Sequence, residues 1–259
     1  KDNEINTVLV ATQHGSHSMF ACEALKNNKH VFVEKPLSTT WEGLKRVETA
    51  YKESKGWLTV GFNRRFAPLA TELKKRLSTN KMNIVATMNA GFIPHDVWVH
   101  DLNKGGGRII GEACHFIDLC TFFTGSKVVE VCMSSMDRNP KKNTDNATII
   151  LKYQNGSNAV INYFSNGSKT YSKERIEVHQ HNSSLILDNW RKLTGYGVKG
   201  FSSKRTSQDK GHFNQFKKLL YSVENASGPI IPWDEVVNTS KATLASVDSL
   251  VEGKWISIK

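Results

Sequence analysis

Two short segments of the sequence contain residue types that can exchange protons with a substrate. The first is the end of an apolar run from His30 to Lys35, which Pro36 stops. The run has the pattern of a strand buried in a parallel sheet, and open α/β sheets bind ligands at the carboxyl ends of such strands. A lysine there, partly removed from water, can act as a general acid or base. The alternative interpretation of Lys35 is a surface lysine that ends a strand.

The second segment begins with three consecutive glycines, residues 105–107, ahead of a predicted helix from about Arg108 to Phe123. Glycines permit a tight turn and a close approach of the backbone to a ligand. Glu112 and Asp118 each lie three residues from His115, so we expect both carboxylates to flank the imidazole on the helix surface. A histidine between carboxylates is a good proton carrier, although a helix histidine is more commonly a packed one.

Alternating strands and helices in the first 80 residues position the first segment. Short apolar runs predict strands, and the stretches between them carry apolar residues at helical spacing. Two successive crossovers from strand through helix to strand make half of a doubly wound sheet. The predicted strands are 7–12, 30–35 and 57–62, and the predicted helices are 16–28, one capped by Thr40, and 68–77.

A complete dinucleotide-binding fold has two such halves, with a glycine-rich phosphate turn after its first strand. Only one half is visible in the sequence, so we interpret residues 1–80 as the C-terminal half of a Rossmann domain. The chain opens with Lys1 rather than methionine and soon reaches a predicted strand, which is typical of a fragment. We therefore expect roughly 60 further residues of this domain ahead of Lys1.

Longer strands with alternating polar and apolar residues follow after residue 80 and predict a second domain over residues 81–259. The Asn-Gly pair at 155–156 predicts a hairpin. The fold class is therefore α/β plus α+β: a truncated Rossmann-like parallel sheet followed by a mostly antiparallel, open sheet. Its predicted strands are 83–92, 128–136, 147–153, 157–164, 175–179 and 184–187, and helices at 212–223 and 233–251 close the chain.

The composition excludes several classes of protein. No apolar run among the 259 residues approaches the roughly 18 that a membrane span needs. Four scattered cysteines are too few for a disulfide scaffold, which favours a reducing, cytoplasmic setting. The net charge of +11 is compatible with a solvated basic surface or with an anionic small molecule. Nucleic acid is disfavoured as a partner, because aromatic residues do not interleave with the basic ones.

Two apparent motifs are set aside. Residues Gly195 to Gly200 fit the pattern G-x-G-x-x-G, but they follow no predicted strand and precede a poor helix start. We interpret them as an ordinary loop. His14, His17 and Cys22 lack a fourth partner at ligand spacing, so capping or packing roles are favoured and no metal is expected.

Several segments together carry a resemblance to a known family. The chain resembles the glucose-fructose oxidoreductase, inositol dehydrogenase and MocA family in Ala11-Thr12 with His17, in Lys29–Leu37, in Gly61–Phe66 and in Gly105–Asp118. A narrower resemblance is to the oxidoreductase half of proteins that also carry a zinc-type dehydrogenase half and are encoded in polysaccharide gene clusters. It rests on residues 145–148, 173–177, 191–197 and 208–212.

The resemblance implies hydride transfer between NAD or NADP and a secondary hydroxyl of a sugar, cyclitol or nucleotide sugar. Lys35 matches the lysine that binds the reacting oxygen, and His115 matches the histidine that exchanges its proton. The residues implied to line the cofactor are Thr12, His17, Glu34, Lys35 and Arg64, and those implied to contact substrate are Lys35, Arg108, His115 and Asp118. The family also implies a cis peptide bond before Pro36 and a homo-oligomer formed through the open sheet.

One departure from the family pattern affects the predicted proton path. Many members have an aspartate four residues before the histidine, whereas this chain has Gly111 there and Glu112 beside it. Glu112 is expected to substitute as the third catalytic residue. The alternative is a redox-inactive module on the same fold that binds a sugar phosphate or serves in assembly.

Overall fold

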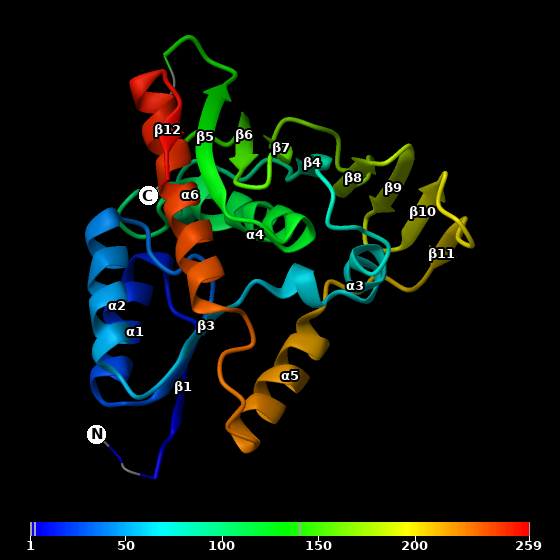
Figure 1. The fold of residues 1–259 in the computed structure, drawn as a ribbon. Coiled ribbons are helices and arrows are strands. Elements are labelled where there is room, and N and C mark those ends of the chain that lie inside the picture. The colour runs from blue at the N-terminus through cyan, green and yellow to red at the C-terminus, as the bar shows by residue number, and fades with distance from the viewer. Residues whose placement is uncertain (1, 3, 140, 259) are drawn as a thin grey trace.

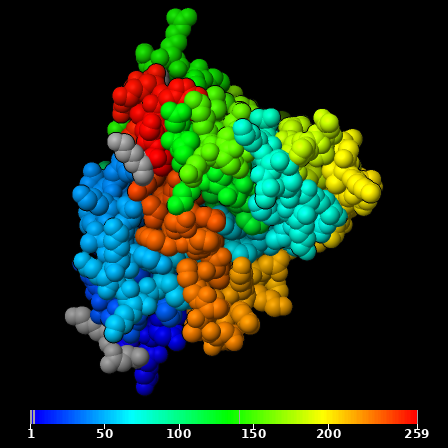
Figure 2. Space-filling view, viewed as in Figure 1, coloured from blue at the N-terminus to red at the C-terminus, as the bar shows by residue number. Residues whose placement is uncertain are grey.

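The computed structural model describes residues 2, 4–139 and 141–258. It contains a three-stranded sheet near the N-terminus and a nine-stranded sheet (Figure 1). The long helix α6 (Trp233–Glu252) packs against strand β5 of the large sheet and also contacts β3 of the small one. Figure 2 shows this C-terminal part, in orange and red, lying between the blue N-terminal segment and the green sheet.

The small sheet confirms the predicted parallel layer. Its strands are β1 (Thr7–Val10), β2 (His30–Val33) and β3 (Leu58–Val60), in the order β1-β2-β3 and all parallel. The side chains of β2 and β3 are almost wholly buried, as expected for a sheet covered on both faces. The helices are α1 (His17–Lys26), α2 (Trp41–Glu53) and α3 (Pro68–Lys74), and the Thr40 side chain caps α2 by accepting from the Gly43 amide.

The large sheet is mostly antiparallel, as predicted, with one parallel pair between β4 and β7. Its order is β11-β10-β9-β8-β4-β7-β6-β5-β12. Its strands are β4 (Asn83–Asn89), β5 (Val128–Ser135), β6 (Ala147–Tyr153), β7 (Asn158–Phe164), β8 (Glu174–Gln180), β9 (Ser183–Asp188), β10 (Lys192–Tyr196), β11 (Ser203–Arg205) and β12 (Ile256–Ser257). The predicted Asn-Gly turn joins β6 to β7, with Gly156 at a φ of +83°.

Three strands escaped the sequence analysis. β12 has only two residues, and β11 is exposed at every position, so neither carries an apolar pattern. β10 contains Gly195, so the statement that the glycine motif follows no strand is wrong. The motif leads through a turn into β11 rather than into a helix, which agrees with its interpretation as a loop.

The helix predicted from Arg108 to Phe123 is not a single α-helix. Residues Ile109–Ala113 form a π-helical turn, and α4 (Cys114–Thr124) follows it. Gly106 and Gly107 lead into this turn with φ angles of +74° and +81°, which side chains at these positions would disfavour. The entry to the helix is therefore irregular, and the side chains before Cys114 do not follow the spacing of a regular α-helix.

The C-terminal helices return to the N-terminal layer. α5 (His212–Glu224) packs against the short helix η2 (Asn63–Phe66), and α6 contacts α2. A boundary near residue 80 therefore stays a prediction. The peptide bond between Lys35 and Pro36 is cis, as the resemblance implied. Across the part of the chain that the structure describes, no helix combines the length and apolar character that crossing a membrane requires.

Candidate active site

Lys35 lies just beyond the carboxyl end of β2 and reaches the π-helical turn. Its side chain is half-buried, and Nζ donates a hydrogen bond of 2.8 Å to the carbonyl oxygen of Gly111. Single π-helical turns inside helices occur frequently at functional sites. The contact brings the first predicted segment onto the second. We call the group Lys35, Gly111 and His115 the Lys35–His115 site.

His115 lies in the first turn of α4 with little contact to water. Its residue is 6% exposed, and its Nδ1 is buried without a hydrogen-bond partner among the described residues. Burial lowers the pKa of His115 well below its ordinary value, and the positive charges of Arg64 and Lys35 lower it further. The imidazole is therefore neutral at pH 7. A neutral imidazole beside a lysine can accept a proton from a substrate hydroxyl.

Glu112, which was expected to flank His115, lies in the π-helical turn and is bound by two other side chains. The Tyr163 hydroxyl donates to Glu112 Oε2 at 2.5 Å, and Arg108 Nη2 lies 3.5 Å from the same oxygen. Burial opposes ionisation of Glu112, but the Tyr163 hydrogen bond and the charges of Arg108 and Lys35 outweigh it and lower the pKa. The carboxylate is thus ionised and held by two side chains.

Asp118 lies three residues after His115 in the regular helix α4, but its carboxylate is paired with another residue. Its side chain is fully buried, and its carboxylate receives two hydrogen bonds from Arg65, at 2.6 and 3.0 Å. Burial raises the pKa of Asp118 to about 6, although the charge of Arg65 opposes this shift. The spacing argument considered only one helix and missed the arginine that η2 supplies. The Asp118 carboxylate is thus engaged by Arg65, and its expected contact with substrate stays a prediction.

Arg64 is held by a second buried carboxylate. Its Nε and Nη2 donate to the two oxygens of Glu174 at 2.9 and 3.0 Å, and Trp190 and Lys210 also donate to Glu174. Burial raises the pKa of Glu174, but Arg64 and Lys210 outweigh it, so the pKa falls to about 2. Arg64 therefore acts on His115 through its charge, while its guanidinium is engaged elsewhere.

Arg108, an expected substrate residue, is also withdrawn from solvent. It is 2% exposed, and its Nη1 donates to the Gly91 carbonyl at 2.8 Å. Its guanidinium carbon lies 5.3 Å from the centre of the Tyr163 ring. Arg108 thus orients Glu112 and Tyr163 beside the site.

The remaining cofactor candidates lie on the loops after β1 and β2. His17 joins these loops, because its Nδ1 lies 2.8 Å from the Pro36 carbonyl oxygen and its Nε2 lies 2.9 Å from that of Thr12. Thr12 is exposed and bonds Ser16 through its hydroxyl at 2.7 Å. The Glu34 carboxylate lies against Gly61, where a Cβ atom would come within 2.8 Å of it. Thr12 therefore remains open to a ligand, whereas His17 holds the two loops together and Glu34 lies against the backbone that follows β3.

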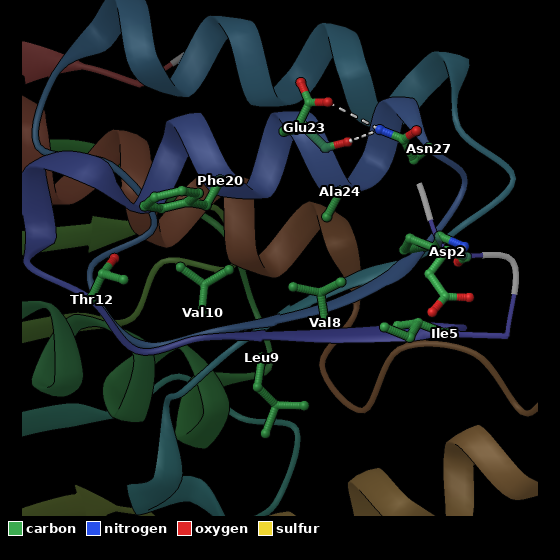
Figure 3. Close-up of a pocket in the computed structure, with 11 residues that line it drawn as sticks. Asp2, Ile5, Val8, Leu9, Val10, Thr12, Phe20, Glu23, Ala24 and Asn27 are labelled. Atoms are coloured by element: carbon green, nitrogen blue, oxygen red, sulfur yellow. Dashed lines mark hydrogen bonds between the residues drawn. The ribbon is translucent and has the colours of Figure 1, made fainter.

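An apolar groove lies beside β1, away from the Lys35–His115 site. It has a volume of about 350 Å³, and Figure 3 shows Val8 and Val10 of β1 facing Phe20 and Ala24 of α1 across it. Thr12, at one end, is the only candidate residue that lines it. The groove therefore contains Thr12 but neither Lys35 nor His115.

The sequence analysis missed the contribution of His14. Its ring lies against Gly111, and Nδ1 is 2.8 Å from the Gly105 carbonyl oxygen. It had been considered only with His17 and Cys22 as a metal candidate; among the described residues no group of three or more suitable side chains could hold a metal ion. The signal that could have found His14 is Gly111 itself, since a missing side chain leaves room for a neighbour.

Comparison with known families decides what this arrangement belongs to. Residues 1–62 match the model of the GFO/IDH/MocA oxidoreductase family with an NAD-binding Rossmann fold. Residues 82–186 match the GFO/IDH/MocA C-terminal domain. The chain belongs to the GFO/IDH/MocA family. The narrower resemblance to proteins with a zinc-type dehydrogenase half stays a prediction.

Individual GFO/IDH/MocA relatives are distant. The chain is 26% identical over 248 residues to the uncharacterized oxidoreductase YrbE of Bacillus subtilis, covering 93% of this chain and 71% of that protein. It is 27% identical over 202 residues to the myo-inositol 2-dehydrogenase of Thermotoga maritima, covering 75% of this chain and 60% of that one. The fold matches levoglucosan dehydrogenase in complex with NADH and levoglucosan, with a TM-score of 0.83, 18% identity, and coverage of 99% and 81% of the two chains.

Proposed function

We propose that this protein is an NAD(P)-dependent dehydrogenase that acts on a secondary hydroxyl of a sugar, cyclitol or nucleotide sugar. The observation that carries the proposal is the meeting of Lys35 and the π-helical turn that precedes His115. Nζ of Lys35 bonds the carbonyl oxygen of Gly111, four residues before His115, at the carboxyl end of a parallel strand, so two segments that carry proton-handling residues are joined there. The names of relatives that act on inositol and on levoglucosan support a polyol as the substrate class.

The residues at this edge fit the nicotinamide end of the cofactor. Thr12 is exposed after β1, and His115 offers a buried nitrogen that lacks a partner among the described residues. An unpaired buried polar atom is rare in a folded protein and calls for an explanation such as a ligand. When bound, the nicotinamide supplies hydride transfer, and the protein supplies orientation and proton transfer.

Lys35 and His115 divide the proton chemistry between them. The Lys35 ammonium donates hydrogen bonds, so it can hold the oxygen of the reacting hydroxyl and stabilise negative charge on it. The neutral His115 can take the proton that this oxygen loses. Gly111 fixes the lysine through its carbonyl, because one of the three ammonium hydrogens is used there and the others remain for substrate.

Replacement of Lys35 tests the proposal directly. We expect Lys35→Ala to lower kcat/KM for oxidation of myo-inositol by about 10²- to 10⁴-fold, followed as NADH absorbance, because the oxyanion loses its donor. The Kd for NADH should change much less. Lys45→Ala, which removes an exposed lysine of α2, is the matched control and should retain full activity.

A native protein that turns over none of a panel of polyols with either NAD or NADP would contradict the proposal. If it then still bound sugar phosphates in calorimetry, the redox-inactive module would replace the dehydrogenase. A Lys35→Ala variant with unchanged kcat/KM would instead show that turnover occurs without the Lys35–His115 site.

The proposal includes a setting and an assembly. Four free cysteines accord with a reducing cytoplasm. The helices α4 and α6 lie on one side of the large sheet in Figure 1, and strand β6 presents the exposed Ile150. This supports a homo-oligomer formed through the open sheet, and sedimentation as a strict monomer at micromolar concentration would contradict it.

A further inference from the structure

Gly111 and His14 fit together in a way that the proposed chemistry does not use. A Cβ atom built on Gly111 would lie 2.8 Å from Cε1 and 3.0 Å from Nδ1 of the His14 imidazole. No side chain can therefore occupy position 111 while the ring stays where it is. Since the Gly111 carbonyl also accepts the Lys35 hydrogen bond, His14 and Lys35 contact the same residue.

The orientation of the His14 ring follows from its partner. A carbonyl oxygen only accepts hydrogen bonds, so the 2.8 Å contact with Gly105 requires that Nδ1 carries the hydrogen. The edge of the ring also packs on Trp98, with 4.9 Å between the ring centres. One nitrogen and one face of the imidazole are thus fixed by the protein.

The other nitrogen of His14 is open. Burial lowers the pKa of His14 to about 4, and the nearby charge of Lys35 adds to this effect, while Glu112 opposes it. A neutral ring with its hydrogen on Nδ1 leaves Nε2 as an acceptor. Nε2 has no hydrogen-bond partner among the described residues and is not among the buried unpaired atoms, so it reaches solvent.

We propose that His14, whose ring fills the space beside Gly111, is a substrate-binding residue whose Nε2 accepts a hydrogen bond from a second hydroxyl of the polyol. The inference rests on the proposed function for the identity of the reacting hydroxyl, which Lys35 holds. A vicinal diol can reach both side chains, because both contact residue 111. An acceptor that carries no hydrogen selects a hydroxyl and disfavours a carboxylate or phosphate oxygen at that position.

Kinetics of three variants test the inference with myo-inositol. We expect His14→Ala to raise KM about tenfold with kcat nearly unchanged, because one hydrogen bond to bound substrate is lost. His14→Asn keeps an acceptor and should restore most of the affinity. Gly111→Ala should raise KM similarly, since its methyl group displaces the ring, and His14→Ala/Gly111→Ala should be no worse than either single change. Additive effects, or an unchanged KM in His14→Ala, would overturn the inference.

A second readout separates this inference from the proposed function. The ¹⁵N resonance of His14 Nε2 should show an unprotonated acceptor near neutral pH, and it should shift when myo-inositol is added to the native protein. The shift should be absent in Gly111→Ala. A shift without turnover would contradict the proposed dehydrogenase activity but support the role of His14 in binding. Turnover without a shift would contradict the role of His14 in binding but support the proposed dehydrogenase activity.

Discussion

The Lys35–His115 site and the adjacent arginine pair differ in how completely their polar groups are paired. Arg64 and Arg65 are consecutive, and each binds one buried carboxylate through two nitrogens. His115, in contrast, has a buried nitrogen without a partner among the described residues, and Lys35 has a single hydrogen bond to a carbonyl. Paired charges hold the fold together, while polar groups with free hydrogen-bonding capacity can bind a substrate.

This contrast shows how to sort a charged motif. Bidentate pairs between arginine and a carboxylate satisfy both partners and fix their geometry. A group whose hydrogen bonds are all used has none left for a reacting molecule. The structure engages Nε and Nη2 of Arg64 with Glu174, and the expected contact of Arg64 with the cofactor stays a prediction. The distinction predicts which substitutions reduce stability and which reduce activity.

Removal of Arg65 should produce the largest loss of stability. Arg65→Met would leave the fully buried Asp118 without its partner, and an uncompensated buried charge costs about 3–5 kcal/mol. Lys35→Met should cost much less, because Lys35 is half-buried and makes one hydrogen bond. Urea unfolding of both variants measures the difference. Equal losses for the two would break the comparison.

A double variant sharpens the same test. Arg65→Met/Asp118→Leu removes both charges, and replacing a whole buried pair by apolar side chains is often close to neutral. Glu235 also lies 2.7 Å from Arg65, but it is partly exposed and can turn to water. We therefore expect the double variant to regain most of the stability. If it stayed as unstable as Arg65→Met, the loss would come from the arginine's packing rather than from the unpaired charge.

The sequence predicted the layers of this fold better than the surroundings of its charges. Alternation of short apolar runs and helices is local information, and it gave the three parallel strands in their correct places, although each predicted strand is two or three residues too long. The partners of Asp118 and Glu112 come from η2 and β7, which are 53 and 51 residues away in the chain. Helical spacing along one segment carries no information about such contacts.

The candidate site was predictable in part for the same reason. Lys35 stood out because it ends a strand, which is a local feature, and the cis bond followed from the family resemblance. Glu174 was present only within residues 173–177 of the narrower resemblance, and Lys210 only within 208–212. The structure brings the two to 2.7 Å from each other. The narrower resemblance therefore included both residues of this ion pair, but it did not indicate that the two segments are in contact.

The pH dependence of stability should differ between the two buried carboxylates, and this difference gives a second test of the comparison. Glu174 has its pKa lowered from 4.5 to about 2, so its contribution to stability is complete above pH 4.5 and is lost as the pH falls towards 2. Asp118 has its pKa raised from 3.8 to about 6, so its contribution is complete below pH 3.8 and is lost as the pH rises through 6. The two residues therefore change stability in opposite directions.

The measurement is the unfolding free energy of the native protein minus that of Glu174→Gln or Asp118→Asn, as a function of pH. For Glu174→Gln the difference should shrink by about 2–3 kcal/mol between pH 4.5 and pH 2. For Asp118→Asn the difference in unfolding free energy should instead decrease as the pH rises from 3.8 to 6. If the free-energy differences of the two variants changed with pH in the same direction, burial and pairing would not have opposite effects on Asp118 and Glu174.

Glu112 lies between the two regions and provides the smallest expected effect. The charge of Lys35 contributes to the lowered pKa of Glu112, but Tyr163 and Arg108 already bind the Glu112 carboxylate. Glu112→Gln keeps an oxygen for the Tyr163 hydroxyl, so we expect kcat/KM to fall less than tenfold, or about 1 kcal/mol. Tyr163→Phe removes that hydrogen bond and should raise the pKa of Glu112, with a similarly small kinetic effect.

Steady-state kinetics with myo-inositol across pH 5–9 compare these two variants with Lys35→Ala. A carboxylate whose partners are in place contributes mainly through the position of Arg108 and Tyr163, so the pH profile of Glu112→Gln should match that of the native protein. A loss as large as that of Lys35→Ala, with a displaced acid limb, would instead place Glu112 on the proton path. In that case, a carboxylate that is bound by two side chains could still take part in proton transfer. Complete pairing would then not distinguish structural residues from catalytic ones.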